Sequence, residues 1–157
     1  VQWHMIADPG ATTGETRHQV ANSTAFDGGE GICFRDDVIY FTSKGDNRIW
    51  AYSVGSQHLD IYYDDDTHDT PILTGVDNII VSPSNELIVA EDGGDLQIVA
   101  IAQDKTLRPL LQLEGHDNSE ITGLAFDPSG QRLYFNSQRG TTGSSASGIS
   151  FEITGQF

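Results

Sequence analysis

Five acidic residues stand at the beginning or the end of short apolar runs, where they could combine into one metal site. They are Glu30, Asp77, Glu91, Asp92 and Glu120. Carboxylate oxygens are the ligands that calcium prefers, and paired carboxylates can also act as general acids and bases. If the apolar runs are equivalent strands of a repeat, these side chains converge on a common axis. The residue types therefore indicate a cation site or an acid/base site.

A block repeated three times supplies such an arrangement. The apolar runs end at Phe34, Val81 and Phe126, which lie 47 and 45 residues apart, and each run is followed by a turn and a second β-rich run. This period is typical of a four-stranded propeller blade. We therefore predict an all-β protein with about three four-stranded antiparallel blades, which is half of a six-bladed β-propeller.

We treat residues 1–157 as a single partial propeller domain. The predicted blades cover approximately 27–66, 72–114 and 117–155. The third blade lacks a fourth strand of its own, so Gln2–Ile6, in the linker 1–26, is expected to act as its closing strand. Because propellers have about four to eight blades, we expect the ring to be completed either in a homodimer or by the missing half of a longer protein.

The charge of the chain excludes several classes of partner. Its 157 residues include 23 acidic and 8 basic ones, which gives a formal net charge of −15. Nucleic-acid binding and attachment to anionic membranes both need a basic surface, so we predict neither. Cys33 is the only cysteine, which rules out a disulfide within the chain. The acidic balance suits a cation binder, although an acidic solvated surface is the commoner reason for it.

Each candidate ligand also has an ordinary structural interpretation. Glu30 lies between Gly29 and Gly31, which either give a ligand room or shape a tight turn. Asp77 suits a strand-start cap, and Asp92 belongs to an Asp-Gly-Gly sequence that is common in hairpin turns. Glu91 then remains on the strand, and Glu120 lies near the register of Glu30 and Asp77 with a small offset.

Histidine and serine do not suggest an alternative catalytic group. The five histidines show no paired spacing, and His116 is predicted to lie on the surface. The chain has no nucleophile-elbow or phosphate-loop sequence. Any chemistry is therefore expected to be metal-assisted, not of the Ser-His-Asp kind.

Blocks along nearly the whole chain resemble the carboxy-terminal part of the PhoX-type alkaline phosphatases. Such blocks are Glu30-Gly31, Arg48-Ile49-Trp50-Ala51-Tyr52, Asp77-Asn78 with Glu91-Asp92-Gly93, and Ser119-Glu120-Ile121-Thr122-Gly123. The chain departs from the family at Gly28, where the family pattern has a phosphate-clamping Arg, and Cys33 does not match the family's iron-binding cysteine.

The resemblance implies a secreted or periplasmic hydrolase that acts on phosphomonoesters with calcium and iron. It implies calcium ligands or ligand supports at the five acidic residues named first, with iron present only if the missing portion of the fold is supplied. This polypeptide alone is then expected to be incomplete as a catalyst. Two other hypotheses stay open: a gluconolactonase-like metal-dependent lactonase, in which Asn78 stands for an Asn ligand, and a non-catalytic half-propeller that associates with itself.

Overall fold

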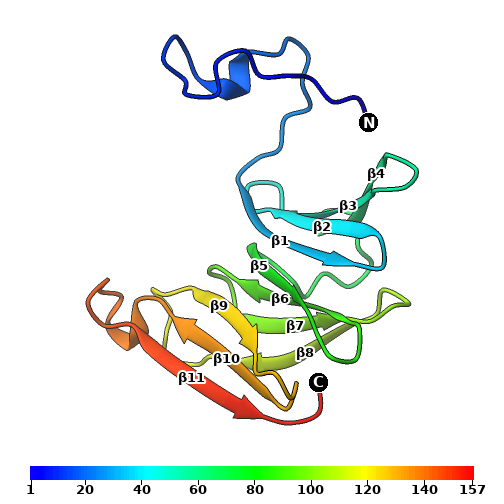
Figure 1. Cartoon of the computed structure of the whole chain (residues 1–157). Helices are drawn as coiled ribbons and strands as arrows, with labels where there is room; N and C mark the ends of the chain where they lie inside the picture. The colour runs from blue at the N-terminus through cyan, green and yellow to red at the C-terminus, as the bar shows by residue number, and fades with distance from the viewer.

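The computed structural model describes all 157 residues and contains three antiparallel sheets that follow one another along the chain (Figure 1). Blade 1 contains β1 (Gly29–Arg35), β2 (Val38–Ser43), β3 (Arg48–Ser53) and β4 (His58–Asp64). Blade 2 contains β5 (Val76–Val81), β6 (Leu87–Glu91), β7 (Gln97–Ile101) and β8 (Leu107–Gln112). Blade 3 contains β9 (Ile121–Phe126), β10 (Arg132–Ser137) and β11 (Ile149–Thr154). No helix is long and apolar enough to cross a membrane.

The all-β prediction with three antiparallel blades is confirmed. Within each sheet the strands pair in chain order, so each blade is a simple meander of four, four and three strands. The first strands pack side by side from blade to blade, β1 against β5 and β5 against β9. These three strands therefore form the innermost layer, and β4, β8 and β11 lie at the outer edges. Pro109 lies on β8, the edge position that its missing N–H predicts.

Each innermost strand contains a bulge at the same place. The strand register shifts by one residue between Gly29 and Ile32, between Val76 and Ile79, and between Thr122 and Ala125. A bulge bends a strand and redirects its side chains, and such bulges are common next to functional sites. The register makes Glu30, Asp77 and Thr122 equivalent residues of the three blades.

Close backbone packing explains the glycine that follows Glu30. A Cβ atom added to Gly31 would lie 2.6 Å from both the Asp77 carbonyl oxygen and the Ile79 nitrogen. The fully buried Thr42 links the two blades there, because its Oγ1 accepts from the Gly31 N–H at 2.8 Å and donates to the Asp77 carbonyl at 2.6 Å. Blade 2 thus fills the space at Gly31, whereas a Cβ atom added to Gly29 would meet nothing within 4 Å.

Two hydrophobic clusters hold the blades together. The first lies between blades 1 and 2 and includes Ile49, Tyr63 and Leu87. The second lies between blades 2 and 3 and includes Ile98, Leu133 and Phe135. Blade 2 is therefore covered on both faces, and every residue of β6 is buried. Each aliphatic side chain that is fully buried contributes about 1.5–3 kcal/mol to folding.

The closing strand predicted at Gln2–Ile6 is wrong for the chain as a single molecule. This segment forms no strand, and β11 pairs only with β10. The Val1 amino group instead donates to the Gln57 carbonyl, and the Trp3 ring packs edge-on against Tyr52 with 5.7 Å between ring centroids. The amino-terminal residues are drawn to blade 1 because its outer face is apolar.

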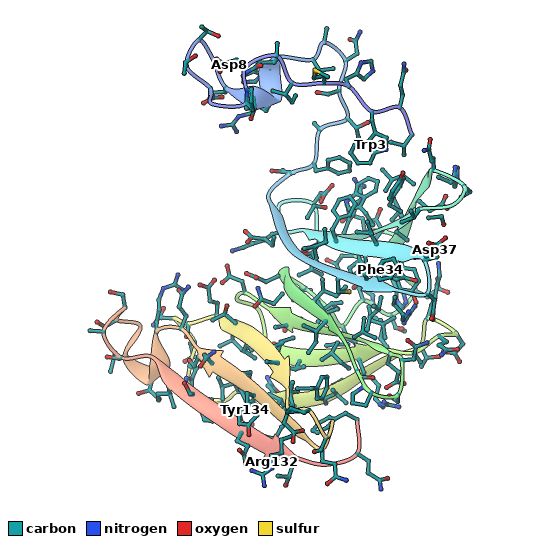
Figure 2. All side chains as sticks on the ribbon, viewed as in Figure 1. Trp3, Asp8, Phe34, Asp37, Arg132 and Tyr134 are labelled. Carbon is teal, nitrogen blue, oxygen red and sulfur yellow. The ribbon has the colours of Figure 1, made fainter.

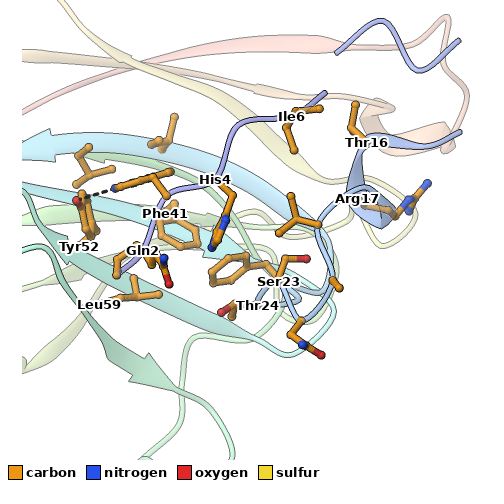
Figure 3. A pocket seen from close by; sticks show the side chains of 18 residues that line it. Gln2, His4, Ile6, Thr16, Arg17, Ser23, Thr24, Phe41, Tyr52 and Leu59 are labelled. Carbon is orange, nitrogen blue, oxygen red and sulfur yellow. Dashed lines mark hydrogen bonds between the residues drawn. The ribbon is translucent and has the colours of Figure 1, made fainter. Parts of the chain in front are cut away.

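That outer face consists of two rows of apolar side chains that run across the blade. Paired positions place Ile32, Phe41, Trp50 and Ile61 in one row and Phe34, Ile39, Tyr52 and Leu59 in the other. Residues of the segment 1–26 cover part of this face and leave a groove of about 820 Å³ beneath them (Figure 3). Ile32 and Phe34 remain 68% and 63% exposed.

The outer face of blade 3 is polar by contrast. Its rows are Ala125, Tyr134 and Glu152, then Thr122, Asn136 and Ser150, with Arg132 beside Glu152. Figure 2 shows Arg132 and Tyr134 on this blade, at the other end of the stack of blades from Phe34 on blade 1. The two end faces of the stack of blades therefore differ sharply in polarity.

Candidate metal centre

Three of the predicted ligands come together between blades 2 and 3. Asp77, Asp92 and Glu120 each place a carboxylate oxygen within 4.8 Å of the other two. Two oxygens bound to one calcium ion at 2.3–2.6 Å can lie up to about 5 Å apart. All three donors are hard oxygens, so this carboxylate trio fits a calcium ion or a similar divalent cation.

The repeated backbone pattern explains why these residues meet. In each blade, the residue that follows the second strand donates its N–H to the carbonyl of the residue that directly precedes the first strand. The pairs are Lys44 to Gly28 at 2.8 Å, Asp92 to Gly75 at 2.8 Å and Gln138 to Glu120 at 3.0 Å. Lys44, Asp92 and Gln138 are therefore equivalent residues. Glu120 is equivalent to Gly28 and Gly75, which accounts for its offset from Asp77.

Asp77 is the most buried member of the trio. The residue is 7% exposed, forms no ion pair, and receives one side-chain hydrogen bond, from Asn78 Nδ2 to its Oδ1 at 2.6 Å. Burial raises the pKa of its carboxyl, and the charges of Glu30 and Glu120 raise this pKa further; Lys44 and the Asn78 hydrogen bond act in the opposite direction. A cation at this position would relieve both the burial and the repulsion.

Two basic side chains border the trio. The Lys44 ammonium contacts Asp92 Oδ2 across the junction between blades 1 and 2. Arg139 Nη2 lies 3.6 Å from Glu120 Oε1 within blade 3. These contacts leave Asp77 as the carboxylate without a basic partner. Lys44 was not among the residues predicted to form the site, although its position after the second strand of its blade matches that of Asp92.

Glu30 lies beside the trio but outside it. It is exposed on β1, and its charge is close enough to raise the pKa of Asp77. Asn78 is directed elsewhere, since its Oδ1 accepts from the Gly123 N–H at 2.6 Å and from Thr122 Oγ1 at 3.3 Å. Asn78 thus joins β5 to β9 and holds Asp77, and its carbonyl is occupied by blade 3.

The structure does not bring Glu91 to the trio. Glu91 is fully buried, and its two carboxylate oxygens accept from the Thr74 N–H at 2.7 Å and from the Gln97 N–H at 2.8 Å. Burial raises the pKa of its carboxyl, and these two backbone donors lower it. The carboxylate therefore fixes the loops on either side of β6.

The residues that are equivalent to Glu91 in the other two blades also make polar contacts with neighbouring segments. The last residue of the second strand is Ser43 in blade 1, Glu91 in blade 2 and Ser137 in blade 3, and we call these three the strand-end residues. Ser43 Oγ accepts from Trp50 Nε1 at 2.8 Å, and Ser137 Oγ pairs with His116 Nδ1 at 2.7 Å. Each of them ties a strand to a neighbouring segment through a buried polar contact.

The predicted surface position of His116 is wrong. The residue is 6% exposed, and besides its contact with Ser137 its ring packs against Phe151. Ser119 Oγ completes this group, at 2.8 Å from Ser137 Oγ, and accepts from the Arg139 N–H. The polar residues next to His116 in the sequence suggested exposure. The ring is buried instead, because it pairs with Ser137, the buried strand-end residue of blade 3.

Comparison with known proteins supports the fold and leaves the family open. No protein-family model matches the chain, and no curated protein matches it. Similar solved structures include a structural-genomics protein provisionally called a gluconolactonase, which is 18% identical with a TM-score of 0.58 and matches 77% of this chain and 39% of its own. A streptogramin B lyase is 19% identical with a TM-score of 0.57, over 84% of this chain and 42% of the lyase.

A luciferin-regenerating enzyme is similar at the same level. It is 18% identical with a TM-score of 0.59, over 81% of this chain and 45% of the enzyme. The chain thus spans less than half the length of each of these proteins. At these identities the likeness establishes the β-propeller fold alone.

Proposed function

We propose that this chain forms part of a metal-dependent β-propeller hydrolase, in which Asp77, Asp92 and Glu120 bind a calcium ion. The observation that carries this proposal is the approach of three carboxylates from two blades to within 4.8 Å of one another, with Asp77 buried and without a basic partner. A bound divalent cation would polarise a carbonyl or phosphoryl oxygen of a substrate.

The residues around the trio hold it in place. Asn78 orients Asp77 and fixes β5 to β9, so the blade junction and the ligand geometry depend on one side chain. The hydrogen bond from Asp92 N–H to the Gly75 carbonyl holds the Asp92 backbone against the start of β5. The site is therefore built on strand ends, which position ligands more firmly than free loops do.

A lactone is the substrate class that the comparisons favour. One solved neighbour carries a gluconolactonase name, whereas none of the three structures described above is a phosphatase. The phosphomonoester substrate implied by the PhoX resemblance is therefore the second class to assay. Because the chain spans under half the length of these propellers, full activity is proposed for the completed ring.

Thermal unfolding with and without calcium tests the cation site directly. We expect calcium in hundredfold excess over its Kd to stabilise the chain by about 2.7 kcal/mol, which is several degrees in Tm. Asp92→Asn and Glu120→Gln should each reduce this shift by more than half, because each removes one charged ligand of three. Asp95→Asn, at an exposed turn position near Asp92, is the matched control.

An unchanged calcium shift in both ligand variants would refute the trio as the site. Turnover of a lactone and of a phosphomonoester by the chain, each with calcium and with chelator, then separates the two substrate classes. Hydrolysis of a phosphomonoester alone would reject the lactonase proposal and leave the cation site standing.

A further inference from the structure

We propose that Lys44 is a built-in counter-cation of the carboxylate trio, which a bound divalent cation displaces from Asp92. This inference rests on the proposed cation site and adds the means by which its affinity is set. The Lys44 ammonium contacts Asp92 Oδ2, although the two residues belong to different blades. A divalent cation bound to Asp92 would repel the Lys44 ammonium at this short range and weaken its contact with the carboxylate.

The position of Lys44 in the repeat supports a role at the site. Lys44, Asp92 and Gln138 are equivalent, since each donates its backbone N–H to the residue that directly precedes the first strand of its blade. The same backbone position thus supplies an anion in blade 2 and a cation in blade 1. Because blades 1 and 2 are adjacent, these opposite charges meet at the inner ends of their strands.

Exposure indicates that this contact can open. The Lys44 side chain is 37% exposed, and that of Asp92 is 16% exposed, so the ammonium can swing into solvent on its flexible stem. Asp77 gains no ion pair from Lys44 and remains at 7% exposure with one hydrogen-bond donor. Lys44 therefore offsets the charge of the trio partially and leaves its buried carboxylate available.

This arrangement makes a quantitative prediction about affinity. Calcium must compete with the Lys44 ammonium for Asp92, and after binding it is repelled by any ammonium that stays nearby. Ion pairs of this exposure are weak, so the competition should reduce calcium affinity by about twofold to fivefold. Lys44→Met removes the charge at nearly constant side-chain length, and Lys44→Arg keeps the charge.

The test is calcium titration of the full 157-residue chain by calorimetry. We expect Lys44→Met to bind calcium about twofold to fivefold more tightly than the natural chain and Lys44→Arg to remain close to it. Lys105→Met is the matched control, because Lys105 is the other lysine and lies over the Tyr62 ring. Equal or weaker binding by Lys44→Met, while the natural chain binds calcium, would overturn the role of Lys44 and leave the cation site intact.

A second measurement reports the displacement itself. The chain has only two lysines, so the two side-chain ammonium signals in a ¹⁵N NMR spectrum can be assigned with the Lys105→Met variant. Calcium should shift the Lys44 signal and leave that of Lys105 in place. A Lys44 signal unmoved by saturating calcium would overturn the displacement. If neither the natural chain nor Lys44→Met binds calcium, the proposed cation site itself fails.

Discussion

The carboxylate trio and the strand-end residues form two polar regions that meet at the end of β6, and they differ in what satisfies their charges. Glu91 belongs to the strand-end residues, and its two oxygens accept from backbone N–H groups. Asp92, the next residue, belongs to the trio and pairs with the Lys44 side chain. Backbone donors are fixed by the fold, whereas a lysine can leave. Of these two adjacent acidic residues, Glu91 therefore has a structural role, whereas Asp92 can exchange its partner.

Among the variants of these two regions, Glu91→Ala is expected to lose the most unfolding free energy. Removing the carboxylate leaves the Thr74 and Gln97 N–H groups unsatisfied in a buried place, which should cost about 2–4 kcal/mol of unfolding free energy. Chemical denaturation measures this loss, and the calcium-induced increase in stability should persist. A variant that keeps its stability but loses the calcium effect would move Glu91 into the trio.

A smaller loss is expected from Ser137→Ala, at the strand-end residue of blade 3. The substitution removes the partner of both His116 Nδ1 and Ser119 Oγ. Each lost neutral hydrogen bond costs about 1 kcal/mol, so the expected loss of unfolding free energy is about 2 kcal/mol. The change should again leave calcium binding unaltered in a thermal-shift titration. A reduced calcium affinity would show that the two polar regions are coupled through Glu120, the neighbour of Ser119.

The smallest effect concerns pH and distinguishes Asp77 from the exposed acids. Its pKa is raised in the folded chain, so its contribution to stability is fully present below the unfolded pKa of about 4 and is lost as the pH rises through the folded value. The calcium-free chain should therefore lose less stability as the pH rises above about 4 when it carries Asp77→Asn. Identical pH profiles of the natural chain and this variant, measured by denaturation, would contradict the raised pKa.

Repeat spacing predicted the blades because strand pairing within a meander is local in sequence. The same spacing placed Asp77 at the inner strand, where the structure has it. It could not separate Glu91 from Asp92, since that distinction depends on which backbone N–H groups surround each side chain. The spacing also could not predict that Gly31 allows close packing between blades. The backbone that crowds Gly31 belongs to blade 2, at Asp77, which is 46 residues further along the chain.

Other parts of the site depend on contacts between blades that sequence spacing does not encode. Lys44 reaches Asp92 only because β1 and β5 pack together. Polar and apolar residues alternate in the segment Gln2–Ile6 as they do in a strand. The segment does not pair with blade 3, because Trp3 packs against Tyr52 on the apolar face of blade 1. His116 looked solvated among polar neighbours, yet its burial follows from its contact with Ser137.

The unequal end faces make the stack of blades directional. If copies of the chain stacked head to tail, the apolar rows that contain Ile32 and Phe34 would cover Arg132 and Glu152. Burying such charges against apolar side chains costs several kcal/mol per ion, so unlimited growth into fibres is opposed at every junction. A sheet that completes this ring must therefore present an apolar surface to blade 1 and a polar surface to blade 3.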